Sequence, residues 1–304
     1  MRLFLFLLVG LSCTAQEIDF EGYVQDVSTK EPIPYVNISF LNTLVGTSTD
    51  EDGAFSITIP KELLSTKVHI SSLGYQDTVL LGKTVYQNKK VELTETTMKL
   101  DEVILSGNFG DSKTYNPVSS YAIKSGFDAS STPWILALYF PNIGAAKKYL
   151  ESVTVFFRER QEFTRDRAKF RLRFFSVDPV TKTPKEDLLR KSILLEAVKG
   201  KEYTTINISD LKLKMPTEGV FVGLEWLFIP YNWYKKDEKD NLTNKPRIED
   251  RFAPTFGGVY SKNSNFKLYV YGMGEWWPFT VQSKGNNQSL IPALSLKVNQ
   301  KLKK

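Results

Sequence analysis

A chain of 304 residues is long enough for two domains. Its net charge of +6 is mildly basic, and acidic residues are interspersed among the basic ones, which excludes a nucleic-acid-binding class. Hydrophobic residues make up 41% and aromatic residues 13% of the chain, which excludes a disordered protein and favours half-buried strands. The only histidine is His69 and the only cysteine is Cys13, so zinc-hydrolase motifs, an intrachain disulfide and iron–sulfur clusters are excluded.

The N-terminus has the pattern of a secretory signal peptide. An arginine precedes a short apolar run, and small residues lead to Ala15, so we predict a signal peptide over residues 1–15. The run is too short for a transmembrane span, and no other run is long enough. The alternative is a lipid anchor on Cys13, which Ser12 before it favours and Gly10, at a position where leucine is expected, disfavours.

Residues 17–107 alternate short extended runs with turn residues. Val36, Ile38 and Phe40 fall on one face of such a run at the period of two that strands show. The acidic stretch at 50–53 lacks the spacing of an EF-hand loop, and we interpret it as a tight turn. Many short strands separated by turns predict a small β-sandwich.

The order of motifs in this region resembles a known family. The motifs are Gly22-Tyr23-Val24, Pro32 to Ile38, Gly46 to Phe55, and Ser72-Leu73-Gly74-Tyr75. They are similar to the carboxypeptidase regulatory-like domain, a transthyretin-like (prealbumin-like) β-sandwich that precedes the plug and barrel of TonB-dependent outer-membrane receptors. Residues 100–107 also resemble the segment that leads into those receptors. The resemblance implies an exported protein of a Gram-negative bacterium, in the periplasm, at the outer-membrane surface or outside the cell. It implies neither peptidase activity nor transport, because the remaining chain is too short for a plug and barrel.

The remainder of the chain predicts a second all-β domain. Residues 108–119 lack apolar periodicity, and we interpret them as a linker. From residue 120 to residue 304 short apolar or alternating runs predominate, and helical periodicity is scarce. We expect an antiparallel β-sandwich of jelly-roll type over 120–304, so that the fold class is all-β. Residues 170–178, 187–189 and 219–226 loosely resemble jelly-roll modules of secreted bacterial proteins.

One strand of this domain shows the most regular alternation. In residues 169–174 the apolar side chains Phe170, Leu172 and Phe174 are expected to point inward, and the basic side chains between them outward. The outward set, with two earlier arginines, could meet anionic glycans or lipid head groups. We favour a solvated strand face, because nearby acidic residues dilute its charge. The basic residues concerned are Arg158, Arg160, Lys169, Arg171 and Arg173.

The sequence carries no catalytic motif, and we assign no catalytic residue, cofactor or metal ligand. His69 lies in an apolar run, and we interpret it as structural or at the surface. Two carboxylates facing each other could still hydrolyse a glycoside without histidine. Candidates for such a pair are Glu225, Asp237, Glu238, Asp240, Glu249, Asp250 and Glu275.

Two aromatic clusters are the candidate ligand-binding residues. Residues 228–258 are long for a loop in a compact domain, and such loops are typically functional or disordered. Rings of either cluster could stack on a sugar or anchor a partner, and the alternative is that they pack inside the sandwich. The candidates are Tyr231, Trp233 and Tyr234 in the first cluster, and Glu275, Trp276 and Trp277 in the second.

These observations lead to three hypotheses about function. The first is an exported, non-enzymatic binding or scaffold protein of the cell envelope. The second is a carbohydrate-binding accessory protein that uses the aromatic clusters. The third is a glycosidase-like hydrolase with paired carboxylates. The expected partners are a glycan or an envelope protein, without nucleic acid.

Overall fold

The computed structural model describes residues 16–96, 109–144, 148–158, 165–239, 244–283 and 287–301. The predicted signal peptide with Cys13, and the receptor-like stretch at 100–107, lie outside the described residues. Strands predominate in the described ranges, where α1 (Gly82–Asn88) is the one α-helix. Three short 3-10 turns accompany it: Lys61–Ser65, Ser120–Ala122 and Ser209–Leu211. The predicted all-β class is thereby confirmed, and no helix in these ranges is long and apolar enough to cross a membrane.

The first β-sandwich has two sheets with one apolar core between them. One sheet has the order β4 (Ala54–Pro60), β1 (Glu17–Asp26), β7 (Lys90–Leu93). The other has the order β3 (Gly46–Ser48), β2 (Asn37–Phe40), β5 (Lys67–Ser71), β6 (Thr78–Leu81). Ile38 and Phe40 are fully buried in the core, as the alternation predicts. Asn37 and Ser39 on the opposite face of β2 are buried as well, because the second domain covers that face.

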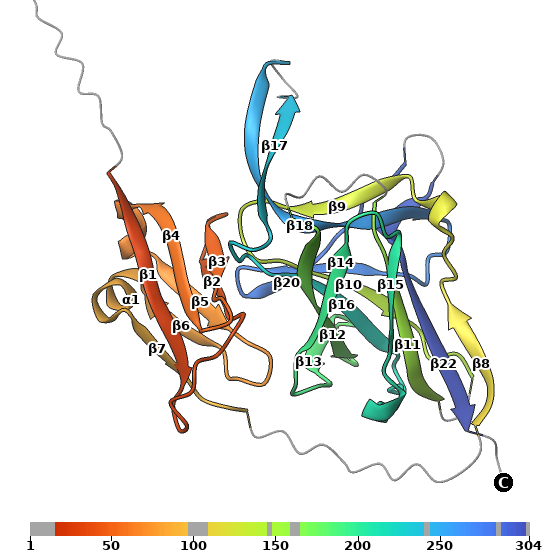
Figure 1. Cartoon of the computed structure of the whole chain (residues 1–304). Coiled ribbons are helices and arrows are strands. Elements are labelled where there is room, and N and C mark those ends of the chain that lie inside the picture. The colour runs from red at the N-terminus through yellow and green to blue at the C-terminus, as the bar shows by residue number, and fades with distance from the viewer. Residues whose placement is uncertain are drawn as a thin grey trace, which may run out of the picture.

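The second domain is an antiparallel sandwich around a larger core (Figure 1). Its main sheet has the order β13 (Pro184–Asp187), β12 (Arg167–Val177), β16 (Val220–Trp226), β10 (Ile135–Phe140), β19 (Leu268–Gly272), β20 (Glu275–Pro278), and β14 (Ile193–Val198) also pairs with β12. The facing layer contains β15 (Tyr203–Asn207), β11 (Lys148–Phe156), β22 (Leu294–Lys301) and β8 (Phe109–Tyr115). It also contains β17 (Trp233–Lys239), β18 (Pro246–Ser261), β21 (Ser289–Pro292) and β9 (Ser125–Ala129). The second sandwich is present, and its jelly-roll connectivity stays a prediction.

The stretch interpreted as a linker contains regular structure. Residues 109–115 form β8, which pairs with β22 from Leu296 to Lys301 at the edge of the facing layer. The linker interpretation did not anticipate this strand, and the domain limits 17–107, 108–119 and 120–304 stay predictions. The reason is physical. An edge strand needs one partner and little burial, so it lacks the apolar alternation that marks an internal strand.

The supposed loop at 228–258 is mostly a β-hairpin. Strands β17 and β18 pair from Trp233 with Phe252 to Lys239 with Pro246, and Figure 1 shows the hairpin rising away from the rest of the second domain. The loop interpretation is wrong here because the hairpin's exposed strands carry charged residues on both faces, which hides their period of two.

Candidate functional site

Charged side chains lie on the outer face of the main sheet, opposite the apolar core. Arg171 on β12 pairs in register with Glu225 on β16, and Arg173 lies two residues further along the same face. We expected the two arginines to be solvated. They are instead 1% and 9% exposed, and Glu225 is fully buried. The prediction of a solvated strand face is wrong for Arg171 and Arg173, because the first sandwich and neighbouring loops cover them.

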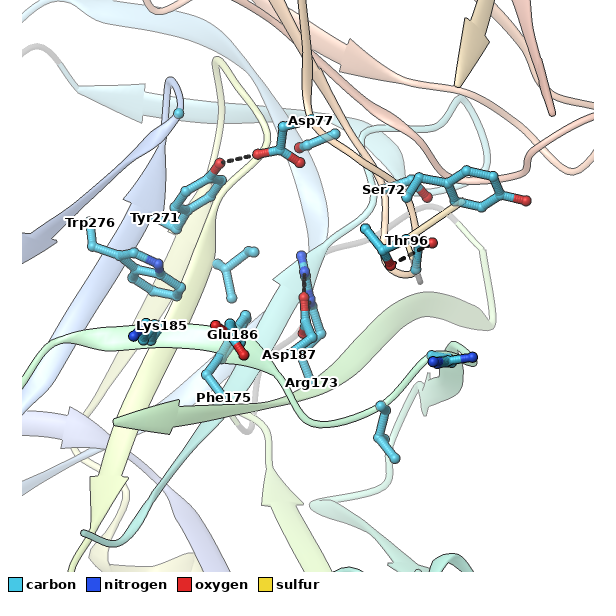
Figure 2. A pocket seen from close by; sticks show the side chains of 17 residues that line it. Ser72, Asp77, Thr96, Arg173, Phe175, Lys185, Glu186, Asp187, Tyr271 and Trp276 are labelled. Carbon is cyan, nitrogen blue, oxygen red and sulfur yellow. Dashed lines mark hydrogen bonds and ion pairs between the residues drawn. The ribbon is translucent and has the colours of Figure 1, made fainter. Parts of the chain in front are cut away.

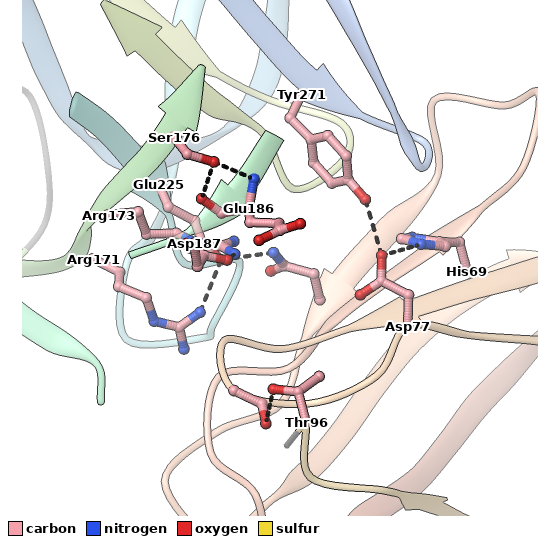
Figure 3. Close-up of polar contacts among 12 residues, drawn as sticks. His69, Asp77, Thr96, Arg171, Arg173, Ser176, Glu186, Asp187, Glu225 and Tyr271 are labelled. Carbon is pink, nitrogen blue, oxygen red and sulfur yellow. Dashed lines mark hydrogen bonds and ion pairs between the residues drawn. The ribbon is translucent and has the colours of Figure 1, made fainter. Parts of the chain in front are cut away.

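These side chains form a buried ionic network with Asp187 (Figure 3). Glu225 Oε1 accepts a hydrogen bond of 3.0 Å from Arg171, and Glu225 Oε2 accepts one of 3.3 Å from Arg173. Arg173 also donates to both carboxylate oxygens of Asp187, with Nε 3.0 Å from Oδ1. Two positive and two negative charges therefore balance, which is the condition under which charges tolerate burial.

The two carboxylates of the network titrate in opposite directions. Burial by itself raises the pKa of Glu225, but the positive charges of Arg171 and Arg173 outweigh it and hold the pKa below its usual value. Burial also raises the pKa of Asp187, and there Arg173 offsets the effect only in part. Of the two carboxylates, Glu225 is therefore the one held more firmly in its ionised form.

The first sandwich supplies the remaining partners of the network. Asn37 on β2 donates a hydrogen bond of 2.7 Å to Glu225, and the backbone carbonyl of Tyr35 accepts one of 2.9 Å from Arg171. Ser48 on β3 holds the Asn37 amide through a hydrogen bond of 3.1 Å to its side-chain oxygen. Because polar groups from both sandwiches satisfy the same buried charges, the network fixes how the two domains dock.

Backbone and apolar contacts extend this interface beyond the network. The backbone N–H of Ser48 donates to the carbonyl of Phe228 at 3.2 Å, and the N–H of Phe228 donates to the Ser48 hydroxyl at 3.1 Å. Beside them, Tyr35 from the first sandwich packs in one buried cluster with Leu227 and Ile229 from the second. The two sandwiches therefore share a continuous interface of polar and apolar contacts.

A histidine–carboxylate–tyrosine contact joins the domains at another point of the interface. His69 Nε2 lies 3.1 Å from Asp77 Oδ2, and the Tyr271 hydroxyl donates to the same oxygen at 3.4 Å. Burial and the negative charge of Asp77 raise the pKa of Tyr271, so this hydroxyl remains a donor at neutral pH. His69 thus makes interdomain contacts, with its ring edge-on to that of Tyr271 at 6.3 Å.

A cavity of about 380 Å³ opens between these contacts (Figure 2). Three rings of the second domain line it (Phe175, Tyr271 and Trp276), and the ion pair of Arg173 with Asp187 also contributes. The first sandwich lines the cavity with the polar residues Ser71, Ser72, Asp77 and Thr96, and with Gly74 and Tyr75 beside them. We call this space the interdomain cleft. It combines fixed aromatic surface with polar groups, which is typical of a ligand site.

The first predicted aromatic cluster does not form a single platform. Tyr231 is half-buried under two cations, Arg165 at 4.8 Å and Lys169 at 5.2 Å from its ring centre. Trp233 is 43% exposed at the base of the hairpin, whereas Tyr234 is 4% exposed. Tyr234 therefore packs inside the protein, as the alternative interpretation expected, while its neighbour Trp233 points to the opposite face of the strand.

The second predicted cluster is divided in the same way. Trp276 lines the interdomain cleft, whereas Glu275 and Trp277 line a different hollow of about 710 Å³. His69 and Leu44 of the first sandwich also line that hollow. Of the six candidate ligand-binding residues, only Trp276 lies in the cleft.

Sequence reasoning missed the other residues of the cleft. One signal pointed to the ionic network beside the cleft: Glu225 interrupts the apolar strand 219–226, and a charge inside an apolar run indicates a buried partner. No comparable signal pointed to Tyr271 or Asp77, because they lie far apart in the sequence and meet only when the domains dock.

In the part of the chain that the structure describes, at least three of the seven carboxylates proposed for hydrolysis contact cations. Both oxygens of Glu225 contact arginines, and on the hairpin Glu238 pairs with Lys236 at 2.9 Å while Glu249 pairs with Arg251. Asp240 lies outside the described residues. Across the described ranges, no three His, Cys, Asp or Glu side chains are grouped as a metal site would need.

Comparison with known proteins finds a family similarity in the first domain. The model of the CarboxypepD_reg-like domain family matches residues 20–105, which confirms the resemblance seen in the sequence. No curated protein matches the chain. One solved structure with similarity contains the cysteine protease and lectin-like domains of Cwp84, a surface layer associated protein of Clostridium difficile. It is 12% identical with a TM-score of 0.34, and the match covers 93% of this chain and 58% of that one. A likeness this distant carries no argument about function.

Proposed function

We propose that this chain is an exported, non-enzymatic binding or scaffold protein of the cell envelope. The observation that carries the proposal is the buried network of Arg171, Arg173, Glu225 and Asp187, completed by Asn37 of the first sandwich. Because the network docks the regulatory-like domain against the second domain, the two domains form one binding unit together.

The chemistry of the polar groups supports binding over catalysis. The most buried carboxylate, Glu225, is fully buried and accepts hydrogen bonds from Asn37, Arg171 and Arg173, so no substrate reaches it and the two arginines disfavour its protonation. Asp187 is likewise held by Arg173. A glycosidase needs one carboxyl group that exchanges a proton during the reaction, and these two serve structure instead.

The second candidate function is carbohydrate binding. The half-buried Trp276 in the cleft and the exposed Trp233 on the hairpin favour it, since indole rings cover the apolar faces of sugars. This function is compatible with an envelope scaffold and requires no catalytic group.

One experiment tests both candidates. The chain from residue 16 onward is applied to a glycan array and to isolated outer-membrane and peptidoglycan fractions, and bound glycans are analysed by mass spectrometry for cleavage. Retention on an envelope fraction without cleavage supports the first function, and binding to defined glycans supports the second. Release of shortened glycans would contradict both and favour the hydrolase.

A further inference from the structure

We propose that the interdomain cleft is a binding site for a short, uncharged saccharide, held by residues of both sandwiches. The inference rests on the carbohydrate-binding candidate above and gives it a location and a ligand class. Three independent features of the cleft carry it: a fixed aromatic wall, polar groups on the other sandwich, and a balanced charge.

Ring contacts hold the aromatic wall of the cleft together. The Trp276 ring meets Phe175 edge-on, with centroids 5.0 Å apart and planes at 80°, and lies 5.1 Å from the Tyr271 ring. Phe175 is only 3% exposed, so it serves as support, whereas Trp276 and Tyr271 are half-buried and line the cavity. A ring already held in place loses little conformational entropy on binding, which favours affinity for a flat apolar face.

Polar groups of the first sandwich line the cleft together with this wall. Ser72, Asp77 and Thr96 contribute to the lining from the first sandwich, and Lys185 and Glu186 from the second (Figure 2). The Asp77 side chain is 51% exposed although it holds His69 and Tyr271, so part of it remains available to a ligand. A pyranose presents an apolar face and a rim of hydroxyl groups, and the cleft offers surfaces for both.

The charge of the lining indicates an uncharged ligand. Three cationic residues line the cleft (Arg173, Lys185 and Arg190), and three acidic residues line it as well (Asp77, Glu186 and Asp187). An anionic or a cationic ligand would meet like charges in this space, whereas neutral hydroxyls can accept from the cations and donate to the carboxylates. The cavity of about 380 Å³ lies at the small end of ligand sites, which fits a short saccharide.

The test measures affinity by isothermal titration calorimetry for defined probes. The neutral probes are cellotetraose, maltotetraose, xylotetraose, mannotetraose and chitotetraose, and the acidic probe is tetragalacturonate. We expect at least one neutral probe to bind, and Trp276→Ala to weaken its binding by about 5- to 150-fold. Tyr121→Ala is the control, because it removes a ring that is 91% exposed and lies outside the cleft, and it should leave the affinity unchanged. Trp233→Ala tests the hairpin as the rival site.

A charge variant keeps the test decisive if Trp276→Ala does not fold. The Glu186 side chain is exposed, so Glu186→Arg should fold normally while it gives the lining a net positive charge. We expect this variant to bind tetragalacturonate about 2- to 5-fold more tightly than the wild type does. If this variant binds both tetragalacturonate and the neutral probe with the same affinities as the wild type does, the cleft site is overturned.

The outcomes separate this inference from the function on which it rests. If Trp233→Ala abolishes binding and Trp276→Ala does not, carbohydrate binding stands and the cleft site is overturned. If none of the probes binds to the folded wild type, both are overturned, and the scaffold function remains. If a probe is cleaved, the non-enzymatic function itself is overturned.

Discussion

The two faces of β12 are both buried, but they are buried by different chemistry. Phe170, Leu172 and Phe174 on the inner face are fully buried in the apolar core of the second sandwich. On the outer face, Arg171 and Arg173 are buried through ion pairs and the polar edge of the first sandwich. The comparison teaches that strand alternation separates two faces, whereas the partner of each face decides whether it meets solvent.

The two faces should also differ in how they respond to substitution. The inner face stabilises the second sandwich by removing apolar surface from water, so a truncation there costs the lost burial and the cavity that it leaves. The outer face depends on a complete set of charges and hydrogen bonds, so the loss of one member leaves the others unpaired.

The largest effect is expected from Glu225→Ala. This variant leaves Arg171 buried without its carboxylate partner, and we expect the free energy of unfolding to fall by about 3–5 kcal/mol. Urea denaturation followed by tryptophan fluorescence measures it. The double variant Arg171→Met with Glu225→Met removes both charges and should recover much of the loss. A loss in the double variant as large as in Glu225→Ala would show that the unpaired charge is not the cause.

Leu172→Ala tests the inner face at the neighbouring position of the same strand. Leu172 is fully buried in the apolar core, and its truncation should cost about 2–5 kcal/mol through lost burial and a residual cavity. The interface should remain intact, so limited proteolysis at 25 °C should give the same pattern as the wild type. New cleavage sites in the first sandwich of this variant would contradict the independence of the two faces.

Asn37→Ala removes a polar contact that crosses the interface. Its amide donates to Glu225, and we expect a loss of about 1.5–3 kcal/mol because the acceptor is a buried charge. The measurement is again urea denaturation. Glu51→Gln is the matched control, since it disrupts an interdomain ion pair with Lys169 in which Glu51 is 64% exposed, and it should change stability little. Equal losses in both variants would contradict the claim that the buried network contributes more to the free energy of unfolding than the exposed ion pair does.

The smallest expected effect is a pH dependence that distinguishes the two carboxylates. Because the folded-state pKa of Glu225 is lowered, its stabilisation is present above the ordinary value of 4.5 and is lost as the pH falls through the folded-state value. The folded-state pKa of Asp187 is raised, so the folded state takes up that proton more readily, and Asp187 opposes the acid loss.

Two variants separate these contributions. Glu225→Gln should flatten the fall of the unfolding free energy between pH 7 and about pH 3, whereas Asp187→Asn should steepen it. The check is a series of urea titrations across this range. The same slope in both variants would mean that other groups dominate the acid response.

The two tryptophans of β20 also lie on opposite faces of a strand, and the environment of each face again depends on the docked domain. Their adjacent positions predict opposite faces, and Trp276 and Trp277 do line different hollows. Which hollow lies beside each ring depends on where the first sandwich docks, since Asp77 and Ser72 line one and Leu44 and His69 line the other. The sequence could therefore predict both tryptophans as candidate ligand-binding residues, but not that only Trp276 lines the interdomain cleft.

The sequence by itself determined the all-β class and the resemblance of the first sandwich to the CarboxypepD_reg-like domain family. Local alternation placed Ile38 and Phe40 in one core and Phe170, Leu172 and Phe174 in the other, because burial of apolar area acts on every second residue of a strand. The family model matches residues 20–105, which contain the motifs that carried the resemblance.

Only the tertiary structure decided the interface and the cleft. Asn37 and Glu225 are separated by 188 residues, and Asp77 and Tyr271 by 194, so no local pattern relates them. Charged residues such as Arg171 and Arg173 are exposed by default and become buried only where partners of opposite charge and matching geometry are brought together. Whether these partners meet depends on how the two folded sandwiches pack against each other, and no local sequence pattern in either sandwich specifies that packing.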